Sequence, residues 1–124
     1  MDNKKLSIRP VLNLGSKSID EDFQNRTLRP ILKLQHSIIL KVFTHFAHKQ
    51  KTDVAVFSFE KLEMHVRSVT RKNTVLRNQL LGLIIGQFTE DEFDIYALND
   101  AEFNKRILTM IGQRITDTYH KNNS

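Results

Sequence analysis

Two histidines, His45 and His48, have the spacing that comes closest to that of a metal site. They lie three positions apart in a segment with helical periodicity, so both imidazoles would project from one face of a helix. A zinc site needs three or four ligands, and no acidic residue lies one turn away to supply another. The pair is a weak metal candidate, and the sequence predicts no metal ion and no cofactor.

The carboxylates and hydroxyls do not form a pattern that predicts catalysis. The acidic residues gather at 20–22, 90–92 and 100–102, where predicted helices begin and where negative charge stabilises the helix dipole. No nucleophile-elbow, phosphate-loop or dinucleotide-binding motif is present, and the 124-residue chain has no cysteine. We therefore predict no catalytic residue and expect a protein without enzymatic activity.

The net charge of +5 is unevenly distributed along the chain. Residues 1–51 carry ten Lys and Arg against four Asp and Glu, whereas residues 89–124 carry four against seven. Such asymmetry favours either a nucleic-acid or acidic partner, or attraction between the two ends within one chain or between two chains. The candidate nucleic-acid contacts are Lys33, Lys41, Arg67, Arg71, Lys72 and Arg77.

The last four of these candidates surround the turn between two predicted helices, as in a helix-turn-helix motif. In that motif the second helix presents polar side chains to the major groove. Here the second helix contains residues 80–85, LLGLII, and is too apolar for that role. Phosphate contacts alone remain open, and a solvated basic surface is the simpler alternative.

The apolar stretch 75–88 contains a glycine pair, Gly82 and Gly86, one helical turn apart. Each glycine costs about 1 kcal/mol of helix propensity relative to alanine. We expect this cost to be offset by a second backbone packed closely against the pair, which makes this the buried central helix. Asn78 and Gln79 lie in the same helix, where they would either set register through buried hydrogen bonds or point to solvent.

Capping signals divide the chain into helices. Ser18-x-x-Glu21 predicts a helix from Ile19, and Pro30 either kinks it or starts another, which frays near Lys49. Residues 54–57 are expected to form an apolar loop. Ser58, Asn73 or Thr74, Thr89 with Glu92, and Asn99 or Asp100 predict the later helix starts.

These signals predict an all-α protein of four to five helices in a compact bundle-like or orthogonal domain. An extended or flexible N-terminal arm would cover residues 1–17, a single helical domain 18–120 and a frayed tail 121–124. The longest apolar run falls far short of the roughly 20 residues that a membrane span needs. No secretory signal is apparent, so we expect a cytoplasmic protein without membrane contact.

Three stretches carry a resemblance to a known family: LRPILKLQ (28–35), LRNQLLGLIIGQFTEDEF (76–93) and LNDAEFNKRI (98–107). Over residues 22–119 the chain resembles a family of short proteins from Bacteroidetes, especially flavobacteria. Some members carry the label glyoxalase, which implies a metal-dependent lyase built from β-α-β-β-β modules. This sequence lacks that strand pattern and repeats no His, Glu and Gln set, so the resemblance implies no site residues.

Three functional hypotheses follow. The first is a non-enzymatic helical interaction module that forms a homo-oligomer or docks on a protein partner. The alternative is a basic nucleic-acid-binding regulator that uses the six residues named above. A glyoxalase-like metal-dependent lyase is the third and least favoured.

Overall fold

A computed structural model describes residues 2–9 and 19–123 of the chain. These residues form helices joined by short connections and contain no β-strand, which confirms the all-α class. In chain order the elements are α1 (Asp2–Ser7), α2 (Ile19–Phe23), the π-helix η1 (Gln24–Leu28), α3 (Arg29–Leu34), α4 (His36–Lys49), the 3₁₀ turn η2 (Val54–Val56), α5 (Phe59–Lys72), α6 (Thr74–Ile85), α7 (Glu90–Ala97) and α8 (Asp100–Asn123). They outnumber the four or five helices expected.

The extra segments arise partly because the chain changes its helical winding before Pro30. A proline lacks the amide hydrogen, and its ring presses on the carbonyl four residues back. The wider turn of η1 accommodates both effects, and the Arg29 N–H donates to the carbonyl of Gln24, five residues back. Phe23 and Leu28 keep right-handed helical dihedrals. The chain therefore follows one helical path through Pro30, and a break comes only at Gln35.

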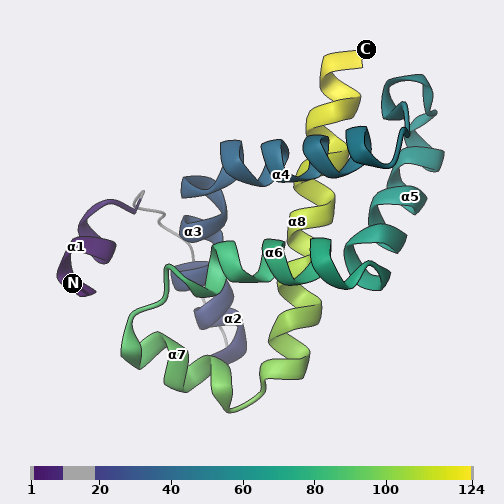
Figure 1. The fold of residues 1–124 in the computed structure, drawn as a ribbon. Coiled ribbons are helices and arrows are strands. Elements are labelled where there is room, and N and C mark those ends of the chain that lie inside the picture. Colours follow the sequence, from purple (N-terminus) through teal and green to yellow (C-terminus); the bar gives the residue numbers. More distant parts are fainter. Residues whose placement is uncertain (1, 10–18, 124) are drawn as a thin grey trace.

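The helix at the centre of the fold is α8, rather than the predicted 75–88 segment. Figure 1 shows α4 and α6 crossing α8, with α5 beside it. Contacts between helices join α8 to α4, α5, α6 and α7. Ile107, Ile111 and Ile115, which share one side of α8, are fully buried. Buried partners from the neighbouring helices include Ile39, Phe43, Leu62, Val66, Leu76, Leu80 and Ile84.

The predicted close approach of a second backbone to the glycine pair is wrong. Both glycines are exposed, and no described atom outside the helix lies within 4 Å of a side-chain carbon placed on Gly82. The reason is helical phase: Leu80 and Ile84 face the core, and Gly82, two residues from each, falls on the opposite side. Gly86 instead forms the C-cap of α6, where its N–H bonds to the Gly82 carbonyl.

The predicted capping residues are confirmed at three helix starts. Ser58 accepts from the backbone of α5 and Asn73 from that of α6. Thr89 and Glu92 form the complete reciprocal capping box of α7. Local side-chain chemistry therefore fixes where these helices begin. Ser18 lies outside the described residues.

The end of α4 is closed by a non-glycine residue in the left-handed conformation. Lys51 has φ 56°, and its N–H donates to the carbonyl of His48 at 3.0 Å. The Thr52 N–H donates to the carbonyl of Ala47, also at 3.0 Å. This is a Schellman motif with lysine in the position that glycine usually occupies. The helix therefore ends in a hydrogen-bonded cap where fraying was expected.

The structure describes parts of the predicted arm and of the predicted tail, and the described parts include helical residues. Residues 2–7 of the expected arm form α1, and Arg9 is buried against the α6–α7 connection. Residues 121–123 of the expected frayed tail continue α8. Residues 10–18 and 124 lie outside the described part of the chain.

Candidate functional site

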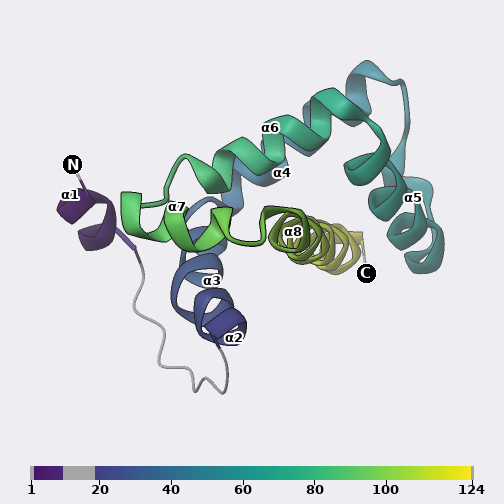
Figure 2. The ribbon, with the colours of Figure 1, turned by 90° about the horizontal axis from the view of Figure 1, so that it is seen from below.

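The exposed side of α8 lies between two grooves. Figure 2 shows α8 nearly end-on, with α2 and α3 on one side and α5 on the other. The larger groove, about 780 Å³, lies between α8 and the stretch that runs from Gln24 to His36. The smaller groove, about 230 Å³, lies between α8 and α5. Thr109, Gln113 and Asp117 line both, so the two grooves form one surface, called here the α8 face.

The α8 face gathers positive charge from three helices. Its Lys and Arg residues are Arg29 and Lys33 from α3, Arg67 and Arg71 from α5, and Lys105, Arg106 and Arg114 from α8. His36 at the start of α4 adds a titratable imidazole. Three carboxylates line the same surface, those of Glu63, Glu102 and Asp117. Positive groups thus outnumber negative ones by more than two to one.

Few of these cations have an acidic partner. Lys105 Nζ lies 3.4 Å from Glu102 Oε1, and Arg67 Nη2 lies 3.1 Å from Glu63 Oε1. Both pairs are solvent-exposed, so each contributes less than about 1 kcal/mol to stability. Among the described residues no carboxylate lies within ion-pair distance of the other five, which are Arg29, Lys33, Arg71, Arg106 and Arg114. These five side chains therefore have no negatively charged partner within the described part of the chain.

Neutral oxygens orient three of the arginines on the α8 face, and one of these contacts runs from Arg106 Nη1 to Gln24 Oε1. Arg29 Nε donates to Asn25 Oδ1 at 3.1 Å, and Arg71 Nη2 donates to Thr109 Oγ1 at 2.7 Å. These oxygens carry no formal charge. They therefore hold the guanidinium groups in place without neutralising them, which leaves other N–H donors of each group for a ligand.

The part of the larger groove around Arg114 and His36 disfavours added positive charge. Burial, followed by the charge of Arg29, lowers the pKa of Arg114. Burial, followed by the charge of Arg114, lowers the pKa of His36. Arg114 Nη1 lies 3.2 Å from His36 Nδ1, and a guanidinium can only donate, so Nδ1 must be unprotonated and accept. A bound anion would relieve the repulsion that both pKa shifts report.

The structure brings together only part of the predicted nucleic-acid set. Lys33 lines the larger groove, and Arg67 and Arg71 line the smaller one, so residues from the two halves of the sequence do meet on the α8 face. The remaining members, Lys41, Lys72 and Arg77, line neither groove. The sequence reasoning missed the contributions of Arg29 and of α8.

The structure supports no role for the two amides in setting register. Asn78 and Gln79 are both exposed on α6. They lie on the same side as Gly82, away from the core, which is the solvent-facing alternative.

The two candidate metal ligands are not joined by further ligands among the described residues. His45 and His48 are both exposed on α4. In residues 2–9 and 19–123 no group of three or more His, Asp or Glu side chains is placed to hold a metal ion. The β-α-β-β-β modules that the glyoxalase label implies are also lacking there, because those residues contain no β-strand.

Comparison with family models, with curated proteins and with solved structures finds no significant match to this chain. The resemblance to the flavobacterial family therefore stays a prediction. None of the described helices is long and apolar enough to cross a membrane.

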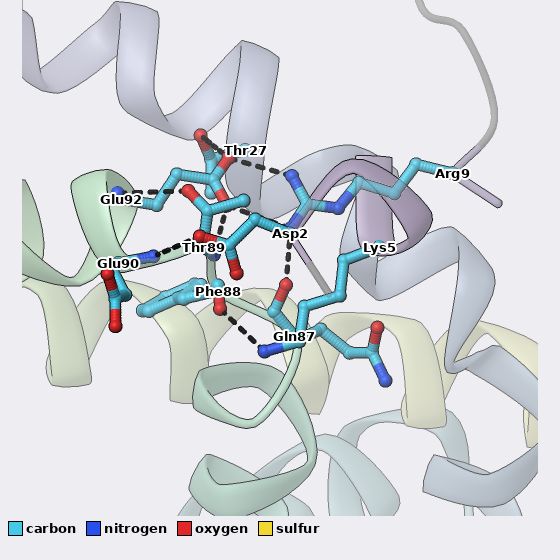
Figure 3. Close-up of polar contacts among 9 residues, drawn as sticks. All are labelled: Asp2, Lys5, Arg9, Thr27, Gln87, Phe88, Thr89, Glu90 and Glu92. Atoms are coloured by element: carbon cyan, nitrogen blue, oxygen red, sulfur yellow. Dashed lines mark hydrogen bonds and ion pairs between the residues drawn. The ribbon is translucent and has the colours of Figure 1, made fainter. Parts of the chain in front are cut away.

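A second polar cluster joins the N-terminal segment to the start of α7, two parts of the chain that are far apart in sequence (Figure 3). The Arg9 guanidinium forms two bonds to the Glu92 carboxylate, Nη1 to Oε2 at 2.7 Å and Nη2 to Oε1 at 2.8 Å. Nη2 also donates to the Gln87 carbonyl. Glu92 further accepts from the Thr89 N–H at 2.9 Å and from Thr27 Oγ1 at 3.0 Å.

This cluster is structural in character. Burial raises the pKa of Glu92, but hydrogen bonds from Arg9, Thr89 and Thr27, together with the Arg9 charge, outweigh it and hold the pKa below its ordinary value of 4.5. A carboxylate that stays ionised and accepts four hydrogen bonds is a weak base and no proton donor near neutral pH. Two further contacts tie α1 to the same connection: Lys5 Nζ donates to the Phe88 carbonyl at 3.0 Å, and Asp2 Oδ2 accepts from the Glu90 N–H at 3.3 Å.

Proposed function

We propose that this protein is a non-enzymatic interaction module that binds an acidic segment of a protein partner on the α8 face. The single observation that carries the proposal is the convergence there of seven Lys and Arg side chains, five of them without a carboxylate neighbour among the described residues. Such an uncompensated surface attracts a negatively charged partner and guides its approach.

The composition of the α8 face favours a protein over a nucleic acid. Glu102 and Asp117 lie among the cations and would repel a continuous phosphate backbone, whereas a peptide can place neutral residues opposite them. The larger groove has no aromatic ring on which a base could stack, and the one aromatic ring that lines the smaller groove, Phe59, packs edge-to-face with His120. Arginine forks also match side-chain carboxylates in a bidentate manner.

The test is a titration of the full chain against a fluorescein-labelled peptide in which Glu and Leu alternate with neutral residues. Fluorescence polarisation should show binding that weakens as salt rises from about 50 to about 200 mM, as expected for charge attraction. The double variant Arg29→Gln/Arg106→Gln should bind at least about tenfold more weakly. Lys41→Gln removes an exposed cation outside both grooves and should leave the affinity unchanged. Equal weakening by both variants, or no binding at low salt, would refute the proposal.

Nucleic acid is the second candidate, and it is favoured by the position of Lys33 on one side of α8 and Arg67 with Arg71 on the other. The same titration with duplex and single-stranded DNA and RNA distinguishes the two. A phosphate-binding surface would show tight binding with a steep logarithmic salt dependence set by the number of phosphates contacted. Tighter binding of these probes than of the peptide would select this candidate.

A further inference from the structure

Helix α7 carries the chemical features that the α8 face lacks. Its residues include four carboxylates and no Lys or Arg, and only Glu92 is engaged by a cation in the described residues. Glu90, Asp91 and Asp94 are exposed. The same short helix and its end expose three large apolar side chains: Phe93 at 46%, Ile95 at 37% and Leu98 at 84%.

We propose that the partner of the α8 face is α7 of a second copy of this chain. This inference rests on the proposed function, because it names the occupant of the same surface. An acidic helix with exposed apolar residues is the kind of segment that the α8 face fits, since that face combines uncompensated arginines with the half-buried Met110. Docking would also cover Leu98, which nothing in the described chain covers.

A chain cannot place its own α7 on its own α8 face. Two attachments hold α7 in its place: Glu92 is bonded to Arg9, and the Tyr96 hydroxyl donates to Asn104 Oδ1 at 2.6 Å. Tyr96 also packs against the rings of Phe88 and Phe103. Because α7 is joined to α8 by only two residues, it cannot swing over that helix without breaking these contacts.

The lengths of the two surfaces are compatible. The eight residues of α7 span about 12 Å at the rise of an α-helix. The groove residues of α8 run from Glu102 to Thr118, which corresponds to about 24 Å. Each copy has one acidic surface, on α7, and one basic surface, the α8 face. Association therefore produces either a reciprocal dimer or a head-to-tail chain.

The test combines two charge-reversed variants of the full chain. Asp91→Lys/Asp94→Lys reverses the charge of α7 and leaves the α8 face unchanged. Arg29→Glu/Arg106→Glu reverses charge on the α8 face and leaves α7 unchanged. All four positions are exposed, so both variants are expected to fold, which far-UV circular dichroism checks. Sedimentation equilibrium should show a mass that rises with concentration for the original chain and a monomer for each variant. An equimolar mixture should form a heterodimer through the one intact pair of surfaces.

Three results would overturn the inference. A chain that stays monomeric at hundreds of micromolar while the acidic peptide still binds would refute self-association and leave the proposed function standing. Oligomers that neither variant disrupts would place the interface elsewhere. Monomeric variants whose mixture also stays monomeric would show that the two surfaces do not meet. Should the α8-face variant fail to fold, Leu98→Ser alone should weaken association, and no effect would count against the inference.

Discussion

Replacing Glu92 by glutamine should destabilise the fold mainly through Arg9. The side chain of Arg9 is 5% exposed and that of Glu92 14%, so the pair is largely removed from water. Glutamine at this position still completes a capping box with Thr89, because its amide oxygen accepts from the same N–H. Its NH₂ group would face the guanidinium, donor against donor. The substitution therefore removes the charge pair and leaves the local helix start intact.

The size of the effect is limited by the N-terminal segment itself. Leaving one partner of a buried pair without its counter-charge costs about 3 to 5 kcal/mol. Residues 2–9 can, however, undock and return Arg9 to water, so the loss cannot exceed the docking free energy of this segment plus the Thr27 bond. We therefore expect Glu92→Gln to lower the free energy of unfolding by about 2 kcal/mol.

A double-mutant cycle with Arg9→Ala, followed by urea unfolding and circular dichroism, isolates the pair. In the Arg9→Ala background Glu92→Gln should cost no more than about 0.5 kcal/mol, which gives a coupling of about 1.5 kcal/mol. The exposed pair of Arg26 and Asp22 is the matched control, and Asp22→Asn should cost at most about 0.5 kcal/mol. A cost for Glu92→Gln that is the same in both backgrounds would show that the two side chains are not paired in solution.

The pair also predicts a pH dependence of stability. Because the pKa of Glu92 is lowered on folding, its stabilising contribution is fully present above the ordinary carboxyl value of 4.5 and is lost as the pH falls through the lowered pKa. The difference in unfolding free energy between the original chain and Glu92→Gln should therefore shrink in acid. A difference that stays constant from neutral to acid pH would contradict this assignment.

Three further predictions concern single positions, all measured by urea unfolding unless stated. Gly82→Ala should raise the free energy of unfolding by about 1 kcal/mol, since the new methyl group meets open space. Gly86→Ala should raise it less, because its Cβ would lie 3.0 Å from the Gly82 carbonyl oxygen. Equal gains from the two substitutions would contradict the packing described. Lys51→Gly should stabilise by about 0.5 to 1 kcal/mol by relieving the left-handed conformation, and a loss would count against that cap. Binding of the acidic peptide should tighten as the pH falls toward the lowered pKa of His36, because an anion between Arg114 and His36 favours the charged imidazole. His36→Gln should abolish this pH dependence, and its persistence would exclude His36.

The sequence predicted features whose causes are local. Ser58, Asn73 and the Thr89–Glu92 pair each satisfy backbone groups within three residues, so their roles can be read from spacing alone. These features need no knowledge of which helices meet.

The features that were missed depend on the relative placement of distant segments. The spacing of Gly82 and Gly86 shows that they share a helix face, but it does not show whether that face is covered. Arg9 and Glu92 are 83 residues apart, and no local signal links them. The α8 face was only partly predicted for the same reason: Arg29, Arg106 and Arg114 become one surface only when α3 packs beside α8.

The structure shows which of the opposite charges in the two parts of the sequence pair with each other after folding. Attraction between a basic N-terminal half and an acidic C-terminal third could have been satisfied inside one chain. Among the described residues, Arg9 with Glu92 is the one ion pair that joins distant parts of the sequence; the others lie within a single helical turn. Folding therefore leaves the exposed carboxylates of α7 and most cations of the α8 face without a partner of opposite charge among the described residues. Two unsatisfied surfaces of opposite sign that cannot meet within one molecule are suited to meet between two.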